Sequence, residues 1–188
     1  CVAKWDPASG TWTNLGNGMN NNVTGFAHDG TNLYAAGNFT TAGWVTANRA
    51  AKWDPVSETW TSLGSGLDKI SYALAYDGTF LYAGGQFTNA GEMTANCLAK
   101  WDLASGTWTN HGTGMNFSVE DLVYDGMTLY VGGNFTNVNG MTAKKVAKWG
   151  PRVTRYSGVV PDSGSVTGGY PVVISGASRS IVTVFEST

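Results

Sequence analysis

Charged residues are scarce in this sequence. Asp, Glu, Lys and Arg make up 13% of its 188 residues, about half of the usual share of about 25%, and the formal net charge is −2. A surface that binds nucleic acid needs clustered Lys and Arg, so this composition excludes a nucleic-acid-binding protein. The sequence also lacks any run of 18 or more apolar residues, so we expect no membrane-spanning helix in this chain.

The residue types that carry most enzyme chemistry are equally few. The sequence has two histidines, His28 and His111, and two cysteines, Cys1 and Cys97. It contains no H-E-x-x-H, G-x-S-x-G, Walker or dinucleotide-binding motif. We therefore predict that the protein is not an enzyme, with no catalytic, cofactor-binding or metal-binding residues.

What the sequence does contain is a repeat without insertions or deletions. The tripeptide AKW begins at Ala3, Ala51, Ala99 and Ala147, at a constant interval of 48 residues. A period near 50 residues indicates one supersecondary unit per copy, stacked on its neighbours to bury a shared core.

Each copy contains four short β-type runs. In the second copy, the alternating run at 71–76 is separated by the Asp77-Gly78 turn from "LYAGG", which starts at Leu81. A longer loop then leads into "CLAKWD", and the Ser105-Gly106 turn reverses the chain into "TWTN". No window of 11 residues keeps a helical spacing of apolar residues, so the predicted fold class is all-β.

Four antiparallel strands per repeat are the plan of a β-propeller blade. Gly84-Gly85 follows a hydrophobic strand, Trp101-Asp102 comes next, and Trp108 lies seven residues after Trp101. In this order of features, and in the longer pattern from "LYAGG" to "AKW", the chain resembles the kelch-like repeats of extracellular and cell-surface proteins. The resemblance covers about residues 1–156 and implies about 3.5 four-stranded propeller blades.

The resemblance also implies roles for the repeated glycines and tryptophans. Glycines such as Gly84 would let neighbouring blades approach closely. The tryptophans would fill the space between blades as the structural core of the repeat; they are Trp5, Trp12, Trp53, Trp60, Trp101, Trp108 and Trp149.

Two further sets of residues have structural interpretations. Asp29, Asp77 and Asp125 recur at the repeat interval, each before a Gly in a tight turn, where Asp caps its own backbone; we therefore interpret them as turn residues and not as metal ligands. Cys1 and Cys97 occupy the same repeat position two copies apart, too far for a disulfide. Cys97 is thus predicted to be a blade residue, and Cys1 is left to a partner outside this chain.

Four N-glycosylation sequons are present, and each has a competing explanation. They begin at Asn22, Asn38, Asn116 and Asn134. Asn38 and Asn134 share a repeat position that Gln86 fills in the second copy, so an amide there also suits a strand end. Asn22 and Asn116 fall in less regular loops and are the stronger glycan candidates.

The long loops are the candidate binding surface. In a blade they would share one end of the sheets, with the short Asp-Gly and Ser-Gly turns at the other. Trp44 lies in one of these loops, where the other copies have Glu92 and Gly140. An exposed Trp would stack on a sugar ring or anchor a protein partner. Alternatively, Trp44 folds back onto its own blade.

The sequence pattern changes after Trp149. A last blade strand is expected at 153–157, and "VVPDSGSVTGGYPVVISG", 159–176, resembles the opening of an IPT/TIG domain, an immunoglobulin-like β-sandwich. The motif residues are Pro161, Ser163-Gly164, Gly168-Gly169 and the alternating run 172–175. A whole sandwich needs about 100 residues, so only its beginning would be present. We therefore predict partial propeller repeats at 1–157 and a partial IPT/TIG-like segment at 158–188.

The blade count bears on how the chain is completed. Closed propellers have about four to eight blades. We expect that both ends of this chain are cut, and that further blades come from a longer protein or from other copies of the chain.

These patterns support two functional hypotheses. The first is a non-catalytic structural module of a large secreted or cell-surface glycoprotein, within an extracellular filament, sheath or adhesive assembly. Its partners would be other copies or other segments of the same assembly. The second is a lectin-like or protein-binding propeller that acts through its long loops, with glycans among its ligands. Both place the protein outside the cell, with covalent N-glycans in place of a cofactor.

Overall fold

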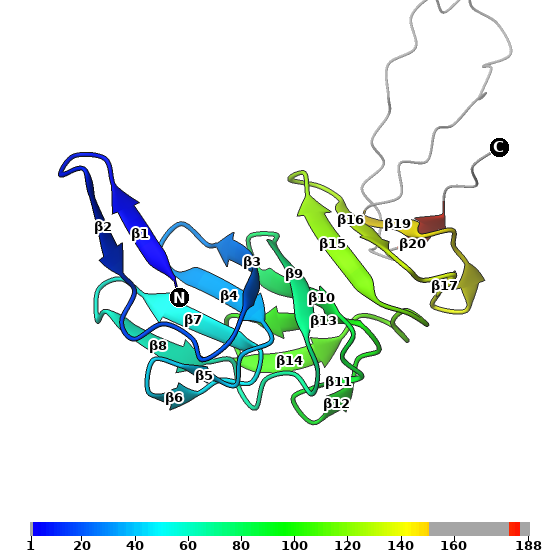
Figure 1. Ribbon diagram of the computed structural model, residues 1–188. Coiled ribbons are helices and arrows are strands. Elements are labelled where there is room, and N and C mark those ends of the chain that lie inside the picture. The colour runs from blue at the N-terminus through cyan, green and yellow to red at the C-terminus, as the bar shows by residue number, and fades with distance from the viewer. Residues whose placement is uncertain (1, 151–180, 185–188) are drawn as a thin grey trace, which may run out of the picture.

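The computed structural model describes residues 2–150 and 181–184 (Figure 1). Every regular element in these ranges is a β-strand, and every strand pair is antiparallel. The predicted all-β class is therefore confirmed. None of the described residues forms a helix that is long and apolar enough to span a membrane.

Three four-stranded sheets, one for each repeat copy, form the body of the described chain, and their strands follow chain order across each sheet. The first sheet contains β3 (Val23–His28), β4 (Leu33–Gly37), β7 (Ala50–Asp54) and β8 (Thr59–Ser62). The second contains β9 (Ser71–Tyr76), β10 (Phe80–Gly85), β13 (Leu98–Asp102) and β14 (Thr107–Asn110). The third contains β15 (Val119–Tyr124), β16 (Leu129–Gly133), β19 (Val146–Gly150) and β20 (Ile181–Val184).

Four small hairpins accompany these sheets. The first, β1 (Ala3–Asp6) with β2 (Thr11–Asn14), precedes the first sheet. The other three lie between the second and third strands of the sheets. They are β5 (Thr41–Ala42) with β6 (Val45–Thr46), β11 (Asn89–Ala90) with β12 (Met93–Thr94), and β17 (Asn137–Val138) with β18 (Met141–Thr142).

The Asp-Gly turns join the first two strands of each sheet as the sequence predicts. In the second sheet, Oδ1 of Asp77 accepts hydrogen bonds from the backbone N–H groups of Thr79 at 2.8 Å and Phe80 at 2.7 Å. Gly78 has a φ of 97°, a conformation that side chains disfavour. Asp29 and Asp125 make the equivalent bonds in the other copies, so their predicted capping role is confirmed.

Neighbouring sheets pack through their first strands, with β9 between β3 and β15 (Figure 1). The approach is close at Gly25, because a Cβ added there would lie 3.0 Å from the carbonyl oxygen of Tyr72 and 3.2 Å from the Cα of Ala73. At Gly84, an added Cβ would collide with Cγ1 of Val119. The expectation that glycines allow neighbouring units to approach is therefore confirmed at these two positions.

The tryptophans of the first and second sheets anchor each of these sheets to the chain segment that enters it. The indole Nε1 of Trp60 donates to the backbone carbonyl of Leu15 at 2.9 Å, and that of Trp108 donates to Leu63 at 2.8 Å. Each pairs with the opposite Trp of its sheet, Trp53 or Trp101, with ring centroids 5.3 Å apart. All four are buried, as predicted for the repeat core.

Trp5 and Trp12 differ from that expectation. They pair with each other, with ring centroids 5.4 Å apart, but their side chains are 46% and 68% exposed. The physical reason is that β1 and β2 form a two-stranded sheet, whereas the equivalent β7 and β8 are completed by β3 and β4. Trp149 is half-buried and packs against the hydrophobic cluster that joins the second and third sheets.

The third sheet is completed by residues that the sequence placed in the IPT/TIG-like segment. Strand β20 pairs with β19, with Val182 opposite Trp149. In the other sheets, this position opposite the Trp is filled by a second Trp. The strand expected at 153–157 and most of the IPT/TIG-like segment lie outside the described residues.

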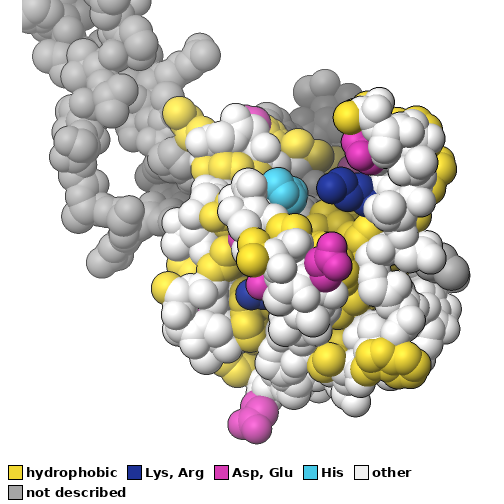
Figure 2. All heavy atoms as spheres, turned by 90° about the vertical axis from the view of Figure 1, so that its left-hand side faces the viewer, with side chains coloured by type: hydrophobic (Ala, Val, Ile, Leu, Met, Phe, Trp, Pro, Cys, Tyr) yellow, Lys and Arg dark blue, Asp and Glu magenta, His cyan; other side chains and the backbone are white. Residues whose placement is uncertain are grey.

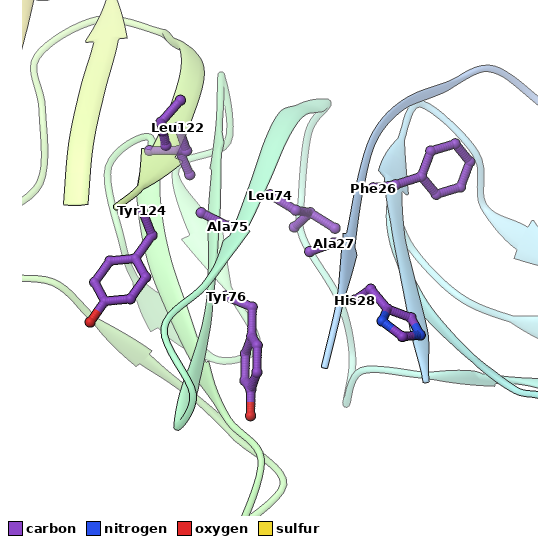
Figure 3. A pocket seen from close by; sticks show the side chains of 9 residues that line it. Phe26, Ala27, His28, Leu74, Ala75, Tyr76, Leu122 and Tyr124 are labelled. Carbon is purple, nitrogen blue, oxygen red and sulfur yellow. The ribbon is translucent and has the colours of Figure 1, made fainter. Parts of the chain in front are cut away.

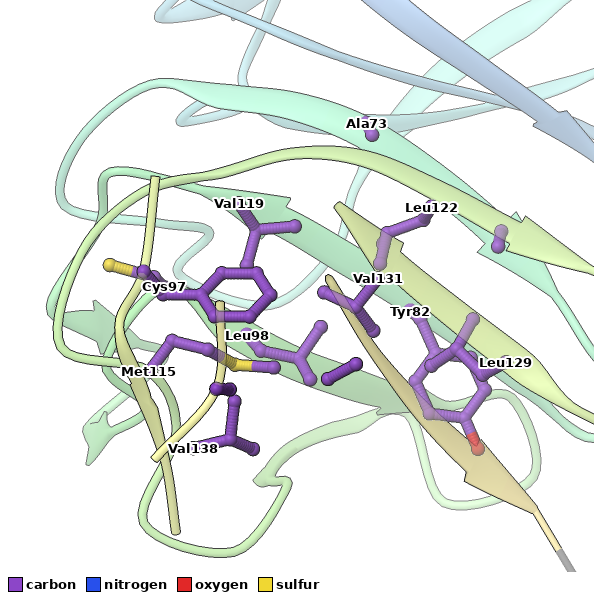
Figure 4. Packing of buried hydrophobic residues seen from close by; sticks show 14 residues of the cluster. Ala73, Tyr82, Cys97, Leu98, Met115, Val119, Leu122, Leu129, Val131 and Val138 are labelled. Atoms are coloured by element: carbon purple, nitrogen blue, oxygen red, sulfur yellow. The ribbon is translucent and has the colours of Figure 1, made fainter. Parts of the chain in front are cut away.

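Three hydrophobic clusters hold the sheets together. One joins the second and third sheets and includes Leu98, Met115, Val119, Leu122 and Val131 (Figure 4). A second cluster joins the first and second sheets through Leu74, Leu81 and Phe87. The smallest lies on the other side of the first sheet. The core is thus a series of contacts between repeat copies.

Candidate functional site

The long connections gather at one end of the sheets, as predicted. In the first copy, the backbone N–H of Asn20 donates to the carbonyl of Thr41 at 3.3 Å, and that of Gly43 donates to Gly18 at 2.6 Å. The second copy repeats both bonds between the equivalent segments. We call this end the loop face; it consists of the hairpins β5–β6, β11–β12 and β17–β18 with the connections beside them.

One side chain in each copy fixes the shape of the loop face. Oδ1 of Asn20 accepts hydrogen bonds from the backbone N–H groups of Thr40 at 2.9 Å and Thr41 at 3.0 Å. Asp68 and Asn116, at the same repeat position, make the same pair of bonds in their own copies. Partial burial by itself would raise the pKa of Asp68, but the hydrogen bonds from Asn89 and Thr88 outweigh it and lower the pKa.

Trp44 projects from the tip of the first loop hairpin. It lies between β5 and β6, and its side chain is 90% exposed. The adjoining Gly43 packs on the ring of Trp60: a Cβ added to Gly43 would lie 3.5 Å from Cδ1 of Trp60. The hairpin therefore packs on the buried Trp60 while the side chain of Trp44 points into solvent. The alternative that Trp44 folds back onto its own sheet is wrong.

Further apolar side chains accompany Trp44 on the loop face. Val45, Met93 and Met141 share one repeat position on the three hairpins and are 38%, 39% and 40% exposed. Phe117 on the neighbouring connection is 58% exposed. The loop face therefore offers apolar contacts in all three copies but only one large aromatic side chain at a hairpin tip.

The four sequon asparagines are all exposed but differ in their bonds. Nδ2 of Asn116 donates to Oγ1 of Thr136 at 2.8 Å, and Nδ2 of Asn134 donates to Ser118 and Glu120. Among the described residues, the side-chain amides of Asn22 and Asn38 have no hydrogen-bond partner. A glycan on Nδ2 would leave the fold's bonds intact at Asn22 and Asn38, so the geometry favours these two over Asn116 and Asn134.

The first strands of the three sheets enclose an open hollow of about 300 Å³. It is lined by β3, β9 and β15, with Leu74 beside Ala27, Leu122 beside Ala75, and His28, Tyr76 and Tyr124 at the end nearest the Asp-Gly turns (Figure 3). These last three residues share one repeat position. The hollow therefore has an apolar wall and one polar rim.

Behind this rim, each turn aspartate also binds a tyrosine. Oδ2 of Asp29 accepts from the hydroxyl of Tyr34 at 2.7 Å, and Oδ2 of Asp77 accepts from Tyr82 at 2.9 Å. Burial and this bond raise the pKa of both tyrosines. Burial by itself would raise the pKa of Asp29, but the bonds from Asn32, Tyr34 and Thr31 lower it to about 2. These carboxylates are therefore committed to the turns.

The two histidines lie apart in different environments. His28 is exposed, and its Nδ1 accepts a hydrogen bond from the N–H of Gly30 at 3.1 Å. His111 is buried between Tyr82 and Trp149, with its Nε2 unpaired. Cys97 is a free, buried thiol whose pKa is raised by burial, in agreement with its predicted place within the repeat. Among the described residues, no group of three or more His, Cys, Asp or Glu is placed to hold a metal ion.

Comparison with known proteins identifies no family. No family model matches the chain, and no curated protein matches it. Among solved structures, the computationally designed Ika4 protein is similar at 12% identity and a TM-score of 0.34, over 63% of this chain and 89% of that chain. The computationally designed Ika8 protein has 12% identity and a TM-score of 0.33, over 62% of this chain and 44% of that chain. Similarity at this level carries no argument about fold or function.

Sequence reasoning missed two features of these surfaces. The first is the unpaired His111, which replaces Leu15 and Leu63 of the other copies; a polar residue at an otherwise apolar repeat position was the available signal. The second is the shared role of Asn20, Asp68 and Asn116. Their constant interval of 48 residues was visible, but the amides that they bind are 20 residues away in sequence.

Proposed function

We propose that the three sheets are consecutive blades of a kelch-type β-propeller, and that this partial propeller is a non-catalytic structural module of a secreted or cell-surface glycoprotein. Its partners are further units of the same kind, from the same assembly. The one-sheet-per-copy stacking around β3, β9 and β15 supports the propeller, as does the hollow between these strands.

The observation that carries the proposal is the exposure of repeat positions on two outer faces. These are the face of the first sheet and the face of the third sheet that point away from the second sheet. Phe26 is 49% exposed, whereas Leu74 and Leu122 at the same repeat position are 7% and 5% exposed. On the opposite outer face, Tyr130 is 38% exposed, compared with 2% for Tyr34 and 6% for Tyr82. Hydrophobic side chains are gathered on the surface at the β1–β2 side of the molecule (Figure 2). Each outer face therefore has the side-chain positions of a contact between sheets, but no neighbouring sheet of the described chain covers them.

Electron microscopy of native source material, with glycopeptide mass spectrometry, tests this proposal. We expect regular filaments or sheets that carry N-glycans, with Asn22 and Asn38 occupied before Asn116 and Asn134. Discrete particles without glycans would contradict the structural role.

A second candidate function is supported by the exposure of Trp44. A side chain that is 90% exposed at the tip of a supported hairpin is suited to stacking on a sugar ring or to anchoring a protein partner. A glycan array probed with the chain and its Trp44→Ala variant tests this function. Binding that is lost in the variant favours the lectin-like propeller, and Trp12→Ala, which removes another exposed Trp away from the loop face, is the matched control.

A further inference from the structure

The two internal contacts between sheets are built in the same way. A leucine of the following sheet, which we call the knob, packs on small residues of the preceding sheet, which we call the socket. The knobs are Leu74 and Leu122 (Figure 3). The sockets are Gly25, Ala27 and Ala36 in the first sheet, and Ala73, Ala75 and Gly84 in the second. The fit is tight, because a Cβ on Gly84 would lie 3.3 Å from Cδ1 of Leu122.

The third sheet presents a socket of different character. Its residues at the same repeat positions are Asp121, Val123 and Gly132. Side chains alternate along a strand, so Asp121 and Val123 point away from the buried Leu122, toward the outer face. Asp121 is exposed, Val123 is 53% exposed, and an added Cβ on Gly132 would meet nothing within 4 Å. No other part of the described chain fills this socket. Compared with the internal sockets, it has a valine in place of an alanine and a carboxylate in place of a glycine or alanine.

The knob at the other end of the molecule does not fit this socket. Phe26 is the knob of the first sheet, and it is larger than the leucines of the two internal contacts. If a second copy stacked its first sheet on the third sheet, the Phe26 ring would press on Val123. It would also cover the Asp121 carboxylate, whose Oδ1 accepts a hydrogen bond from the backbone N–H of Leu122, without supplying a donor to Oδ2, which is unfavourable. Head-to-tail stacking of identical copies is thus disfavoured by the residues themselves.

We infer that the third socket receives a lysine or arginine knob, carried by a sheet unit other than the first sheet of a second copy. The inference rests on the proposed stacking of repeat units. The aliphatic part of such a side chain would pack on Val123 and the half-exposed Tyr130, while its cationic end pairs with Asp121. The knob should occupy the position that Leu74 and Leu122 occupy in the internal contacts, and the carboxylate of Asp121 favours a positive charge on it.

The chain itself provides a probe, because its exposed knob can be changed without disturbing the core. Phe26→Arg places a guanidinium on the first sheet, where it meets Asp121 if a second copy stacks on the third sheet. We expect the full chain to remain a single-chain particle in sedimentation velocity. The F26R variant should associate at least about tenfold more tightly, and added salt should weaken this association. Adding Asp121→Asn to F26R should abolish the gain.

A rebuilt internal contact separates the two ways of failing. The variant F26L/D121G/V123A gives the outer faces the leucine of the internal knobs and the residue types of Gly25 and Ala27, and it keeps Gly132, which matches Gly84, so it should associate without dependence on salt. If it associates and F26R does not, the cationic knob is wrong while the stacking stands. If the rebuilt variant fails to associate, the stacking itself is wrong and the inference falls with it. Wild-type association as tight as that of F26R also overturns the inference.

Discussion

At the scale of single residues, burial divides positions that the repeat presents as equivalent. Trp12, Trp60 and Trp108 occupy one repeat position, yet they are 68%, 3% and 5% exposed. The two buried indoles each donate a hydrogen bond to a carbonyl of the preceding connection, Leu15 or Leu63. The energetic role of each Trp therefore depends on what packs against it.

Trp108→Ala is expected to destabilise the protein by about 3–5 kcal/mol, because it removes a buried aromatic side chain together with its hydrogen bond to the Leu63 carbonyl. Trp12→Ala should change the free energy of unfolding by no more than about 0.5 kcal/mol, because its side chain is mostly exposed. Urea unfolding followed by circular dichroism measures both. Equal losses in the two variants would contradict this account of the tryptophans.

His111 is the residue from which we expect a pH effect. Burial, together with repulsion from Lys100, lowers its pKa from 6.5 to about 4, although Asp77 partly opposes the shift. Because the folded state resists protonation, stability is fully present above pH 6.5 and is lost as the pH falls toward 4. The total loss is about 3 kcal/mol, at about 1.4 kcal/mol for each pH unit.

The variant His111→Leu tests this effect, because Leu15 and Leu63 already fill the position in the other copies. It should remove the contribution of His111 to the loss between pH 6.5 and pH 4 and raise stability at neutral pH, since the unpaired buried Nε2 is removed. Unfolding midpoints in urea at several pH values are the measurement. An unchanged pH dependence in His111→Leu would contradict this account.

At the scale of elements, the sheets make their closest contacts at glycines. A Cβ on Gly25 would crowd the backbone of β9, and one on Gly84 would crowd Val119 and Leu122. Strands β3, β9 and β15 belong to three different sheets, so side-chain packing holds them together and not a ladder of backbone hydrogen bonds. Between β3 and β9, the hydroxyl of Thr24 adds a hydrogen bond to the carbonyl of Ser71 at 2.6 Å. Small residues at these positions therefore set the distance between sheets.

Gly84→Ala is expected to cost about 1–3 kcal/mol, because its new methyl group must displace Val119 from a packed contact. Gly132→Ala, at the same repeat position in the third sheet, should cost no more than about 0.5 kcal/mol, because nothing lies within 4 Å of an added Cβ. Thermal unfolding of the two variants provides the comparison. If Gly132→Ala is as harmful as Gly84→Ala, the outer face of the third sheet is covered in solution.

At the scale of the whole molecule, the described chain is a stack whose members contact only their neighbours. The second sheet has a sheet on each side, whereas β1 and β2 form a hairpin with no sheet beyond them. In such stacks, stability is approximately a sum of unit and interface contributions. The centre should therefore be the most resistant to opening.

Hydrogen exchange should follow this order. We expect the slowest amide exchange in β9 and β10, intermediate rates in β4 and β16, and the fastest in β1 and β2, because fewer contacts must open toward the ends. Exchange followed by mass spectrometry resolves these peptides. Uniform protection from β1 to β16 would show instead that the chain opens as a single cooperative unit.

The sequence by itself determined the repeat and the local structure of each copy. The interval of 48 residues, the alternating runs and the Asp-Gly turns are short-range signals, so strand positions such as 71–76 and the caps at Asp29, Asp77 and Asp125 follow from them. The tertiary structure decided what each copy meets. It left Trp5, Trp12 and Trp44 exposed, buried His111, and paired Ile181–Val184 with β19. Identical sequence motifs have different environments because burial depends on the neighbouring sheet, and a local pattern carries no record of whether that neighbour is present.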